Sequence, residues 1–203
     1  METIDLYQIH WPSDDVRELV EGWSTMAALQ REGKVRWIGA SNFNVEQLML
    51  AQAIAPVTSL QPPYSLVRPE VESEVLPFCE DEGIGVIVYS PMASGLLTGA
   101  MTRKRISQMP EEDWRKNSRA FNEPRLSANL ALVERLRTVG NRRGYAPGAV
   151  AVAWTLRHPA VTAAIVGARR AEQVNDVVAA TQLHLLPSDL AEIEGRAELA
   201  GRS

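Results

Sequence analysis

The stretch VRWIGASNF at residues 35–43 decides the fold, because an apolar strand sequence runs there into a polar turn at Ser41–Asn42 and then into a helix. The same succession occurs five times along the chain. Strands that alternate with helices return in the same direction, so this rhythm predicts a parallel sheet of the α/β class. The other four stretches are IDLYQIHW at 4–11, VTSLQPPYS at 57–65, GVIVYSPMASG at 85–95 and AAIVGARR at 163–170.

The number of units sets the expected size of that sheet. A closed (β/α)8 barrel of the TIM type takes roughly 250 residues, whereas this chain has 203 residues and five units. We therefore expect an incomplete barrel of about five βα units, followed by extra helices towards the C-terminus. Neither a linker nor a low-complexity tract interrupts the rhythm, so residues 1–203 are expected to form a single partial barrel domain.

Bulk composition narrows the classes of partner. A net charge of −4 argues against a nucleic-acid surface, which needs a concentrated basic face. No apolar run approaches the ~20 residues that span a bilayer, and the N-terminal stretch METIDLYQIH carries neither a basic region nor an apolar leader. Cys79 is the one cysteine, which excludes an internal disulfide and fits a reducing compartment. We expect a cytoplasmic protein with no nucleic-acid or membrane partner, and a packing role for Cys79.

Local signals predict several helix ends. Asn44 followed by Gln47 is the pattern of a capping box at the start of a helix. Ser188 is expected to cap a last helix over residues 187–200. The charged region 92–124, which contains glycine and proline, predicts a long irregular loop around a substrate or cofactor.

Polar side chains stand where the predicted strands end, which is where parallel barrels bind ligands. His10 ends the first strand on the same side as Leu6 and Gln8, by two-residue alternation. If that side faces the barrel axis, the imidazole points into the mouth; otherwise a histidine at a strand end is a structural residue. His158 and His184 show no ligand spacing with it, so no metal site is expected.

The next strand ends carry amide and aromatic groups. Ser41, Asn42 and Gln61 can hydrogen-bond a planar amide ligand, although serine and asparagine at such positions also cap helices. Tyr89 offers a face for stacking on a flat heteroaromatic ring, or simply packs at the rim. Taken together, these ends favour a ligand with an amide and an aromatic ring.

The fifth strand ends in a glycine and arginine loop, Gly167 to Arg170, where a helix begins. Glycine permits close backbone approach, and the helix start offers free N–H donors and positive charge. The two arginines supply forked donors suited to phosphate, although a solvated arginine pair is the plainer alternative. With the other strand ends, this loop matches a nicotinamide dinucleotide. By itself it would also fit a flavin enzyme.

Five pieces of the sequence carry a resemblance to a known family: DLYQIHWP at 5–12, GKVRWIGASNF at 33–43, VIVYSPMASGLLTG at 86–99, AVAWTLRHP at 151–159 and AAIVGARRAEQV at 163–174. In this order they resemble the aldo-keto reductases, particularly bacterial members that are similar to the voltage-gated potassium channel β subunits. The resemblance covers essentially the whole chain. It implies an oxidoreductase that uses NADP(H) to reduce small carbonyl substrates, aldehydes or ketones, to alcohols.

The resemblance also implies roles for individual residues. His10 matches the catalytic histidine that orients the carbonyl substrate. The positions that match contacts to the nicotinamide are Ser41, Asn42, Gln61 and Tyr89. Those that match the pyrophosphate path are Ser90, Met92 and Ser94, and those around the adenosine end are Gly167, Ala168, Arg169, Gln173 and Asp176. The Arg169–Arg170 pair is compatible with a 2′-phosphate, which favours NADP(H) over NAD(H).

One part of the family pattern has no match. The family's proton donor is a tyrosine assisted by a lysine and an aspartate on the first strands of the barrel, and this sequence begins at the equivalent of the fourth strand. Tyr7, Tyr64 and Tyr145 match none of the catalytic positions. The resemblance therefore implies a truncated chain that is weakly active or inactive alone, since general acid catalysis contributes ~10²–10⁴-fold.

An opened barrel would also expose its edges. Strand edges at Ile4–Ile9 and Thr162–Val166 would be unpaired and could pair with another chain. The apolar faces of Leu6, Ile38 and Val88 would lose partners. The alternative function is thus a non-catalytic nucleotide-binding or interaction protein that forms a homo-oligomer through these edges.

Overall fold

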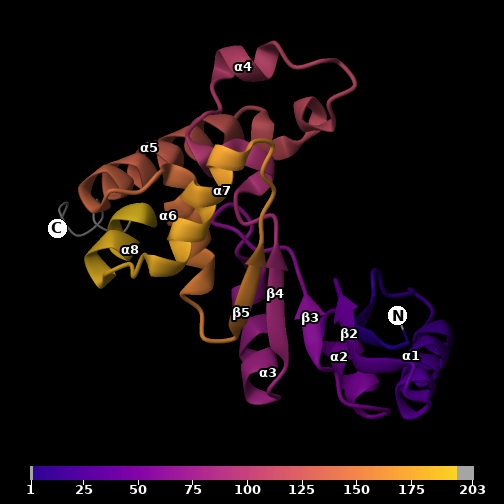
Figure 1. Ribbon diagram of the computed structural model, residues 1–203. Helices are drawn as coiled ribbons and strands as arrows, with labels where there is room; N and C mark the ends of the chain where they lie inside the picture. The colour runs from indigo at the N-terminus through magenta and orange to yellow at the C-terminus, as the bar shows by residue number, and fades with distance from the viewer. Residues whose placement is uncertain (1, 196–203) are drawn as a thin grey trace. The chain divides into compact units, whose positions relative to one another are not determined.

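The structure is a computed structural model that describes residues 2–195. It contains two compact units. Figure 1 draws the chain as a ribbon, coloured from the N-terminus to the C-terminus. Unit 1 comprises Met1–Tyr64, Glu70–Tyr89 and Pro159–Ala163. Unit 2 comprises Ser65–Pro69, Ser90–His158 and Ala164–Ser203.

A parallel sheet forms the centre of unit 1. The strands follow one another in chain order, β1-β2-β3-β4-β5, and Figure 1 shows β2 to β5 in this succession. The pairs β1–β2, β2–β3 and β3–β4 are all parallel. The expected α/β barrel-type topology with five strands is therefore confirmed. The strands are β1 Ile4–Ile9, β2 Val35–Ser41, β3 Ser59–Gln61, β4 Gly85–Tyr89 and β5 Val161–Ile165.

Three α-helices connect the strands of unit 1: α1 Val16–Arg31, α2 Val45–Gln52 and α3 Val75–Asp81, preceded by the short 3-10 helix η1 Glu70–Glu72. Helix α1 packs on β2 and on α2, and α3 packs on β4. The capping box before α2 is confirmed, because Asn44 Oδ1 accepts from Gln47 N at 2.9 Å and Gln47 Oε1 accepts from Asn44 N at 3.0 Å.

The two faces of the sheet differ in burial. Ile38 and Val88 are fully buried, so the expectation that they lose partners is wrong. Strand alternation places Ile38 and Val88 on one face of the sheet. It places Leu6 and its register partner Trp37 on the other face. On that second face Leu6 is half-buried and Trp37 is 51% exposed. Of the three residues, only Leu6 lies on the face that also carries His10.

Unit 2 is mostly helical, and its long helices are gathered together in Figure 1. Helix α6 is buried on nearly all sides, as its continuous apolar sequence predicts. It packs against α5 and α7. The helices are α4 Arg103–Ser107, α5 Arg125–Arg143, α6 Pro147–Leu156, α7 Ala171–Val178 and α8 Pro187–Ile193, with 3-10 helices η2 Ala93–Thr98, η3 Trp114–Asn117, η4 Arg119–Phe121 and η5 Ala179–Gln182.

The region 92–124 is more ordered than an irregular loop. It forms a series of short helices, and Figure 1 shows α4 on a connection that extends from the longer helices. Six buried apolar side chains pack into one cluster that holds this region together. These six are Leu96, Met101, Ile106, Met109, Phe121 and Leu126.

The start of α8 differs from the sequence prediction. The helix begins at Pro187, and Asp189 rather than Ser188 provides the cap: its Oδ2 accepts from Leu186 N at 3.0 Å. Asp189 is only 2% exposed and is bonded to Arg142 and Arg143 of α5. The helix ends at Ile193, earlier than the predicted end at residue 200, and residues 196–200 of the prediction lie outside the described residues.

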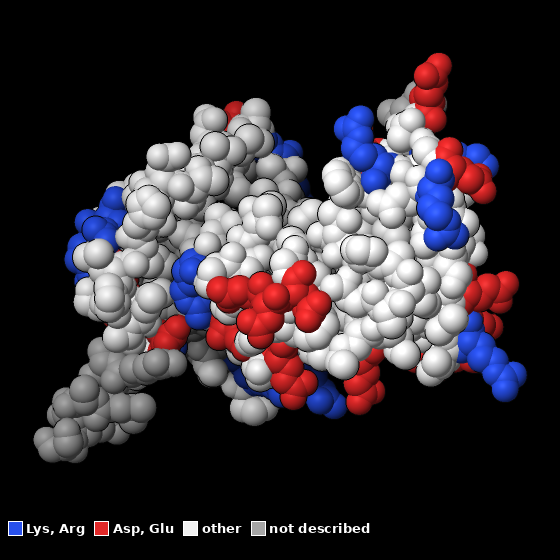
Figure 2. Space-filling model, turned by 90° about the horizontal axis from the view of Figure 1, so that it is seen from below, with Lys and Arg blue, Asp and Glu red and all other residues white. Residues whose placement is uncertain are grey.

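In residues 2–195, no helix has both the length and the apolar character needed to cross a bilayer. Within the same range, no three His, Cys, Asp or Glu side chains are grouped so as to hold a metal ion. On the face drawn in Figure 2, acidic side chains gather near the centre, while lysines and arginines are scattered.

Candidate functional site

The predicted site residues of unit 1 lie at one edge of its sheet. His10 directly follows β1, Ser41 ends β2 and Gln61 ends β3. The register pairs Ser41 with Gln61, and a further parallel bridge pairs Pro63 with Tyr89 at the end of β4. The carboxyl ends of these strands are therefore level, and the polar side chains meet there.

Asn42 is the centre of this group. Its φ of 64° lies in the left-handed region, which asparagine adopts more readily than most residues. Its Nδ2 donates to His10 O at 2.9 Å and to Ser41 Oγ at 3.0 Å, and its Oδ1 accepts from Tyr89 Oη at 2.8 Å. Because a backbone carbonyl only accepts, the bond to His10 O fixes which way the Asn42 amide faces.

Ser41 and Gln61 complete the group. Ser41 Oγ donates to Gln61 O at 2.7 Å, and Ser41 is 3% exposed. The Gln61 side chain donates through Nε2 to Gln8 Oε1 at 3.1 Å. Within residues 2–195, the second N–H and the Oε1 of Gln61 have no protein partner. An amide with one free donor and one free acceptor is therefore presented at the half-buried end of β3.

His10 holds a different position from the amides. Its backbone carbonyl is bonded to Asn42, but its side chain is exposed. The imidazole centroid lies 6.0 Å from that of Trp11, with the rings tilted by 41°. In the described part of the chain the ring makes no hydrogen bond, so both nitrogens are accessible to a ligand.

The stretch from Ser90 to Ser94 belongs to unit 2 and has an unusual backbone. Ser90, Ala93 and Ser94 have φ values of 57°, 48° and 55°, and such strain is concentrated at functional sites. Arg115 Nη1 donates to Ser94 O at 3.4 Å. The sulfur of Met92 lies against α6, where a Cβ at Gly148 would approach it to 3.2 Å.

The loop before α7 differs in one respect from the expectation of free helix-start donors. Gln173 Oε1 accepts from Arg169 N at 2.8 Å and from Arg170 N at 3.2 Å, so these two backbone donors are not free. The side chain of Gln173 reaches back to cap its own helix. Ala168 and Asp176 are exposed, and a Cβ at Gly167 would meet no atom within 4 Å.

The charges of unit 2 favour an anion at this loop. The guanidinium groups of Arg169 and Arg170 make no ion pair with the described residues. Nearby, hydrogen bonds from Arg115 lower the pKa of Asp113 to about 2, and the charge of Arg169 acts in the same direction. Asp113 is thus satisfied mainly by Arg115, which leaves the two loop arginines available to a ligand.

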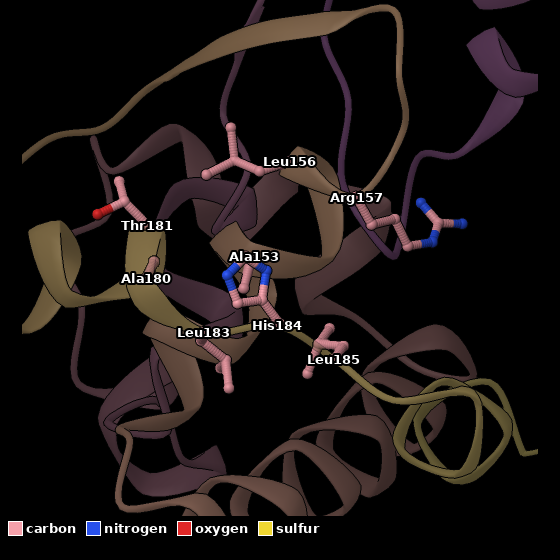
Figure 3. A pocket seen from close by; sticks show the side chains of 8 residues that line it. All are labelled: Ala153, Leu156, Arg157, Ala180, Thr181, Leu183, His184 and Leu185. Carbon is pink, nitrogen blue, oxygen red and sulfur yellow. The ribbon is translucent and has the colours of Figure 1, made fainter.

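Two further features, Cys79 and a pocket of unit 2, lie outside this set of residues. Cys79 is fully buried and burial raises the pKa of its thiol to about 12, which confirms a packing residue and excludes a thiolate nucleophile. A pocket of about 300 Å³ in unit 2 is lined by none of the predicted site residues, and Figure 3 shows Thr181 and Arg157 on opposite sides of it. The remaining lining residues are Ala153, Leu156, Ala180, Leu183, His184 and Leu185.

The structure therefore brings together His10, Ser41, Asn42, Gln61 and Tyr89 within unit 1. The predicted residues of unit 2 form a strained turn and a cationic loop. Sequence reasoning did not assign a role to Gln8, although the alternation of β1 placed it on the same face as His10. That face assignment was the signal that could have identified it.

Comparisons with known proteins agree on one family. The model of the aldo/keto reductase family matches residues 1–198. Aldo-keto reductase YhdN of Bacillus subtilis is 36% identical over 191 residues, which make up 94% of this chain and 57% of YhdN.

Solved structures give the same result. Glycerol dehydrogenase AKR11B4 from Gluconobacter oxydans has a TM-score of 0.88 and 34% identity, over 96% of this chain and 58% of that one. The thermostable aldo-keto reductase Tm1743 has a TM-score of 0.71 and 25% identity, over 96% of this chain and 60% of that one. This chain thus spans less than two thirds of the length of these relatives. The chain belongs to the aldo/keto reductase family.

Proposed function

We propose that the chain binds NADP(H) and belongs to an oxidoreductase that reduces small aldehydes or ketones to alcohols. The observation that carries the proposal is the hydrogen-bonded group around Asn42, which joins three strand ends through one side-chain amide. Membership of the aldo/keto reductase family supports the reaction class.

The donor set of unit 1 fits a nicotinamide carboxamide, which has one carbonyl acceptor and two N–H donors. Gln61 retains one free N–H and a free Oε1, so it can pair with either end of such an amide. The hydroxyl of Tyr89 is held by Asn42, which fixes the ring for stacking on the nicotinamide. When bound, NADPH supplies a hydride to the carbonyl carbon of the substrate.

His10 is assigned to the substrate oxygen. Its exposed imidazole can donate an N–H to the carbonyl and so orient it, while Asn42 holds the backbone at His10 in place. Within residues 2–195 the imidazole ring makes no hydrogen bond, so no described side chain competes with the substrate for its N–H.

The residues of unit 2 are assigned to the remainder of the cofactor. The free cations of Arg169 and Arg170 suit a 2′-phosphate, which supports NADP(H) over NAD(H). Because Gln173 Oε1 caps α7, its contribution to a ligand is limited to its Nε2. The pyrophosphate is assigned to Ser90, Met92 and Ser94, and the adenosine end to Gly167, Ala168, Arg169, Gln173 and Asp176.

We further propose that these residues alone catalyse the reduction weakly or not at all. Tyr64 is fully buried with its hydroxyl bonded to Glu72, and the Tyr89 hydroxyl is engaged by Asn42. Tyr7 lies on the opposite side of β1 from His10 by alternation. None of these three therefore offers a free hydroxyl beside His10, and the loss of a general acid costs ~10²–10⁴-fold in rate.

Titration of the chain with NADPH, followed by quenching of tryptophan fluorescence, tests the proposal. The wild type is expected to bind saturably and to prefer NADPH to NADH. Asn42→Gly removes the amide but keeps the positive φ, and we expect NADPH binding about tenfold weaker, near the upper end for one net hydrogen bond. The matched control is Asn141→Ala on the exposed side of α5, which should bind as the wild type does.

The adenosine end is tested with 2′,5′-ADP, which lacks the nicotinamide. Asn42→Gly should bind 2′,5′-ADP normally, whereas Arg169→Ala should bind it less tightly. Absence of NADPH binding tighter than about 1 mM would contradict the proposed function. Rapid turnover of 4-nitrobenzaldehyde by the chain alone would instead contradict the expectation of weak catalysis.

A second candidate function is an interaction protein that forms homo-oligomers. The observation in its favour is that β1 is an edge strand among the described strands, with Ile4 and Tyr7 exposed, and that Trp37 on the neighbouring β2 is half-exposed. Size-exclusion chromatography with light scattering decides this. A dimer that dissociates in Ile4→Lys supports it, and a monomer at all concentrations contradicts it.

Two broader expectations remain proposals. We propose that residues 1–203 act as a single partial barrel domain, which the continuous chain order of the five strands supports. We also propose a cytoplasmic location. The one cysteine, Cys79, is buried and unpaired, and a chain without an internal disulfide fits a reducing compartment.

A further inference from the structure

Two polar side chains of unit 1, Gln8 and Ser59, meet above Gly39 on the face that carries His10. The register pairs Gln8 with Gly39 and Gly39 with Ser59, so the three residues stand side by side on β1, β2 and β3. Gln8 Nε2 donates to Ser59 Oγ at 3.1 Å, across the intervening strand. A Cβ on Gly39 would lie 2.4 Å from Ser59 Oγ and 3.1 Å from Gln8 Cγ, so the contact requires that residue 39 has no side chain.

The contacts give the Gln8 amide one orientation. Its Nε2 also donates to Ala40 O at 3.5 Å, and a backbone carbonyl accepts but cannot donate. The NH2 group of Gln8 must therefore face Ala40 and Ser59, and its Oε1 must face Gln61 at the end of β3. Gln61 Nε2 donates to that Oε1 at 3.1 Å.

This orientation is passed on to Gln61. Because Gln8 Oε1 can only accept, it selects the NH2 end of the Gln61 amide and directs the Gln61 Oε1 away from itself. Without Gln8, a half-turn of the Gln61 amide would interchange its donor and acceptor at little cost. The backbone of β2 thus sets which hydrogen-bonding group Gln61 offers to a ligand.

We propose that Gln8 is a positioning residue that fixes the Gln61 amide with its Oε1 directed at a bound nicotinamide, and so makes the site select the NH2 group of the carboxamide. The inference rests on the proposed function, which places the nicotinamide at these strand ends. It goes beyond the proposed function because, among residues 2–195, the hydrogen bonds of the Gln8 side chain go to Gln61, Ser59 and Ala40, so its effect on a ligand passes through Gln61.

A binding experiment with two dinucleotides separates positioning from a merely structural role. The first is NADP⁺; the second is its 3-acetylpyridine analogue, in which a methyl group replaces the NH2 of the carboxamide. The wild type should bind NADP⁺ more tightly than the analogue. Gln8→Leu should bind NADP⁺ about 2–12-fold less tightly, the range of one net hydrogen bond, and should lose most of the discrimination between the two.

Two variants and one ligand serve as controls. Gln8→Glu keeps an acceptor for Gln61 and should retain more discrimination than Gln8→Leu. Gln30→Leu removes a glutamine of α1 that donates to Arg36 O at 3.0 Å, away from the site, and should bind both dinucleotides as the wild type does. Binding of 2′,5′-ADP should be unchanged in all three, which also verifies that each variant is folded.

The outcomes distinguish the inference from the proposed function. If the wild type binds NADP⁺ and Gln8→Leu discriminates against the analogue as strongly as the wild type, the positioning role of Gln8 is refuted while the proposed function stands. If the wild type binds 2′,5′-ADP but shows no preference between NADP⁺ and the analogue, the role assigned to Gln61 is refuted as well. If the wild type binds neither dinucleotide, the proposed function itself fails.

Discussion

Replacement of Gly39 by alanine should destabilise unit 1, because β2 and β3 approach each other too closely there for a side chain. The new Cβ would lie 2.4 Å from Ser59 Oγ, 2.9 Å from Ser59 O and 3.1 Å from Gln8 Cγ. The Ser59 hydroxyl and the Gln8 side chain can rotate away. The Ser59 carbonyl belongs to the strand backbone, so the 2.9 Å contact is relieved only if β3 shifts.

The expected cost follows from these contacts. Overpacking of this kind costs about 1–3 kcal/mol, and the displaced Gln8–Ser59 hydrogen bond is worth about 0.5–1.5 kcal/mol. The smaller entropy of an unfolded chain with alanine returns about 0.4–1 kcal/mol. Together these ranges give an expected net loss of about 0.5–4 kcal/mol in the free energy of unfolding of Gly39→Ala.

Urea unfolding followed by tryptophan fluorescence measures this loss. Gly22→Ala in α1 is the matched control, since its Cβ would meet only Ile9 Cδ1 at 3.8 Å, and helix propensity predicts a gain of about 0.5–1 kcal/mol. The double variant Gly39→Ala, Ser59→Ala removes the hydroxyl clash but keeps the backbone clash, so it should recover only part of the loss. A Gly39→Ala variant as stable as the wild type would refute the close-approach reasoning.

Three further predictions concern charge and burial. Asp189→Asn should lower the free energy of unfolding by about 1.5–3 kcal/mol, because the buried carboxylate accepts charged hydrogen bonds from two arginines of α5. Glu192→Gln should lower it by less. Equal losses for the two variants in chemical denaturation would contradict this prediction. Arg115 lowers the pKa of Asp113 to about 2, so the contribution of the Asp113 carboxylate to stability is complete above about pH 4 and is lost as the pH falls towards 2. The wild type and Asp113→Asn should therefore converge in thermal stability over that pH window. A constant difference between them would refute the prediction. Cys79, whose thiol pKa burial raises to about 12, should react with Ellman's reagent at pH 8 only as fast as the chain unfolds; rapid reaction of the folded chain would show that it is exposed.

Much of the fold could be predicted because its signals are local. The apolar stretch at residues 35–43 became β2, and the polar turn after it led directly into α2 through the Asn44–Gln47 capping box. Both features depend on residues within a few positions of one another. The almost continuous apolar sequence of α6 likewise predicted its burial.

Features that depend on distant residues could not be predicted. The cap of α8 moved from Ser188 to Asp189 because two arginines 47 and 46 residues earlier in the chain stabilise that carboxylate in a buried position. Ile38 and Val88 were expected to lose partners, but strand alternation places them on the face opposite His10. The expectation had counted apolar residues without separating the two faces.

The candidate site shows the same division. The residue types at the strand ends were visible in the sequence, since Asn42, Gln61 and Tyr89 each follow an apolar stretch. Their bonds were not, because Asn42 reaches His10 and Tyr89 across 32 and 47 residues. The capping of α7 by Gln173 was missed because only the geometry shows that its Oε1 turns back to Arg169 N.

A crystal structure of the chain grown with NADP⁺ tests the central claim most directly. The account predicts that the carboxamide of the nicotinamide lies within hydrogen-bonding distance of the Gln61 side chain, with the ring against Tyr89. A structure in which NADP⁺ binds with its nicotinamide away from both residues would contradict it.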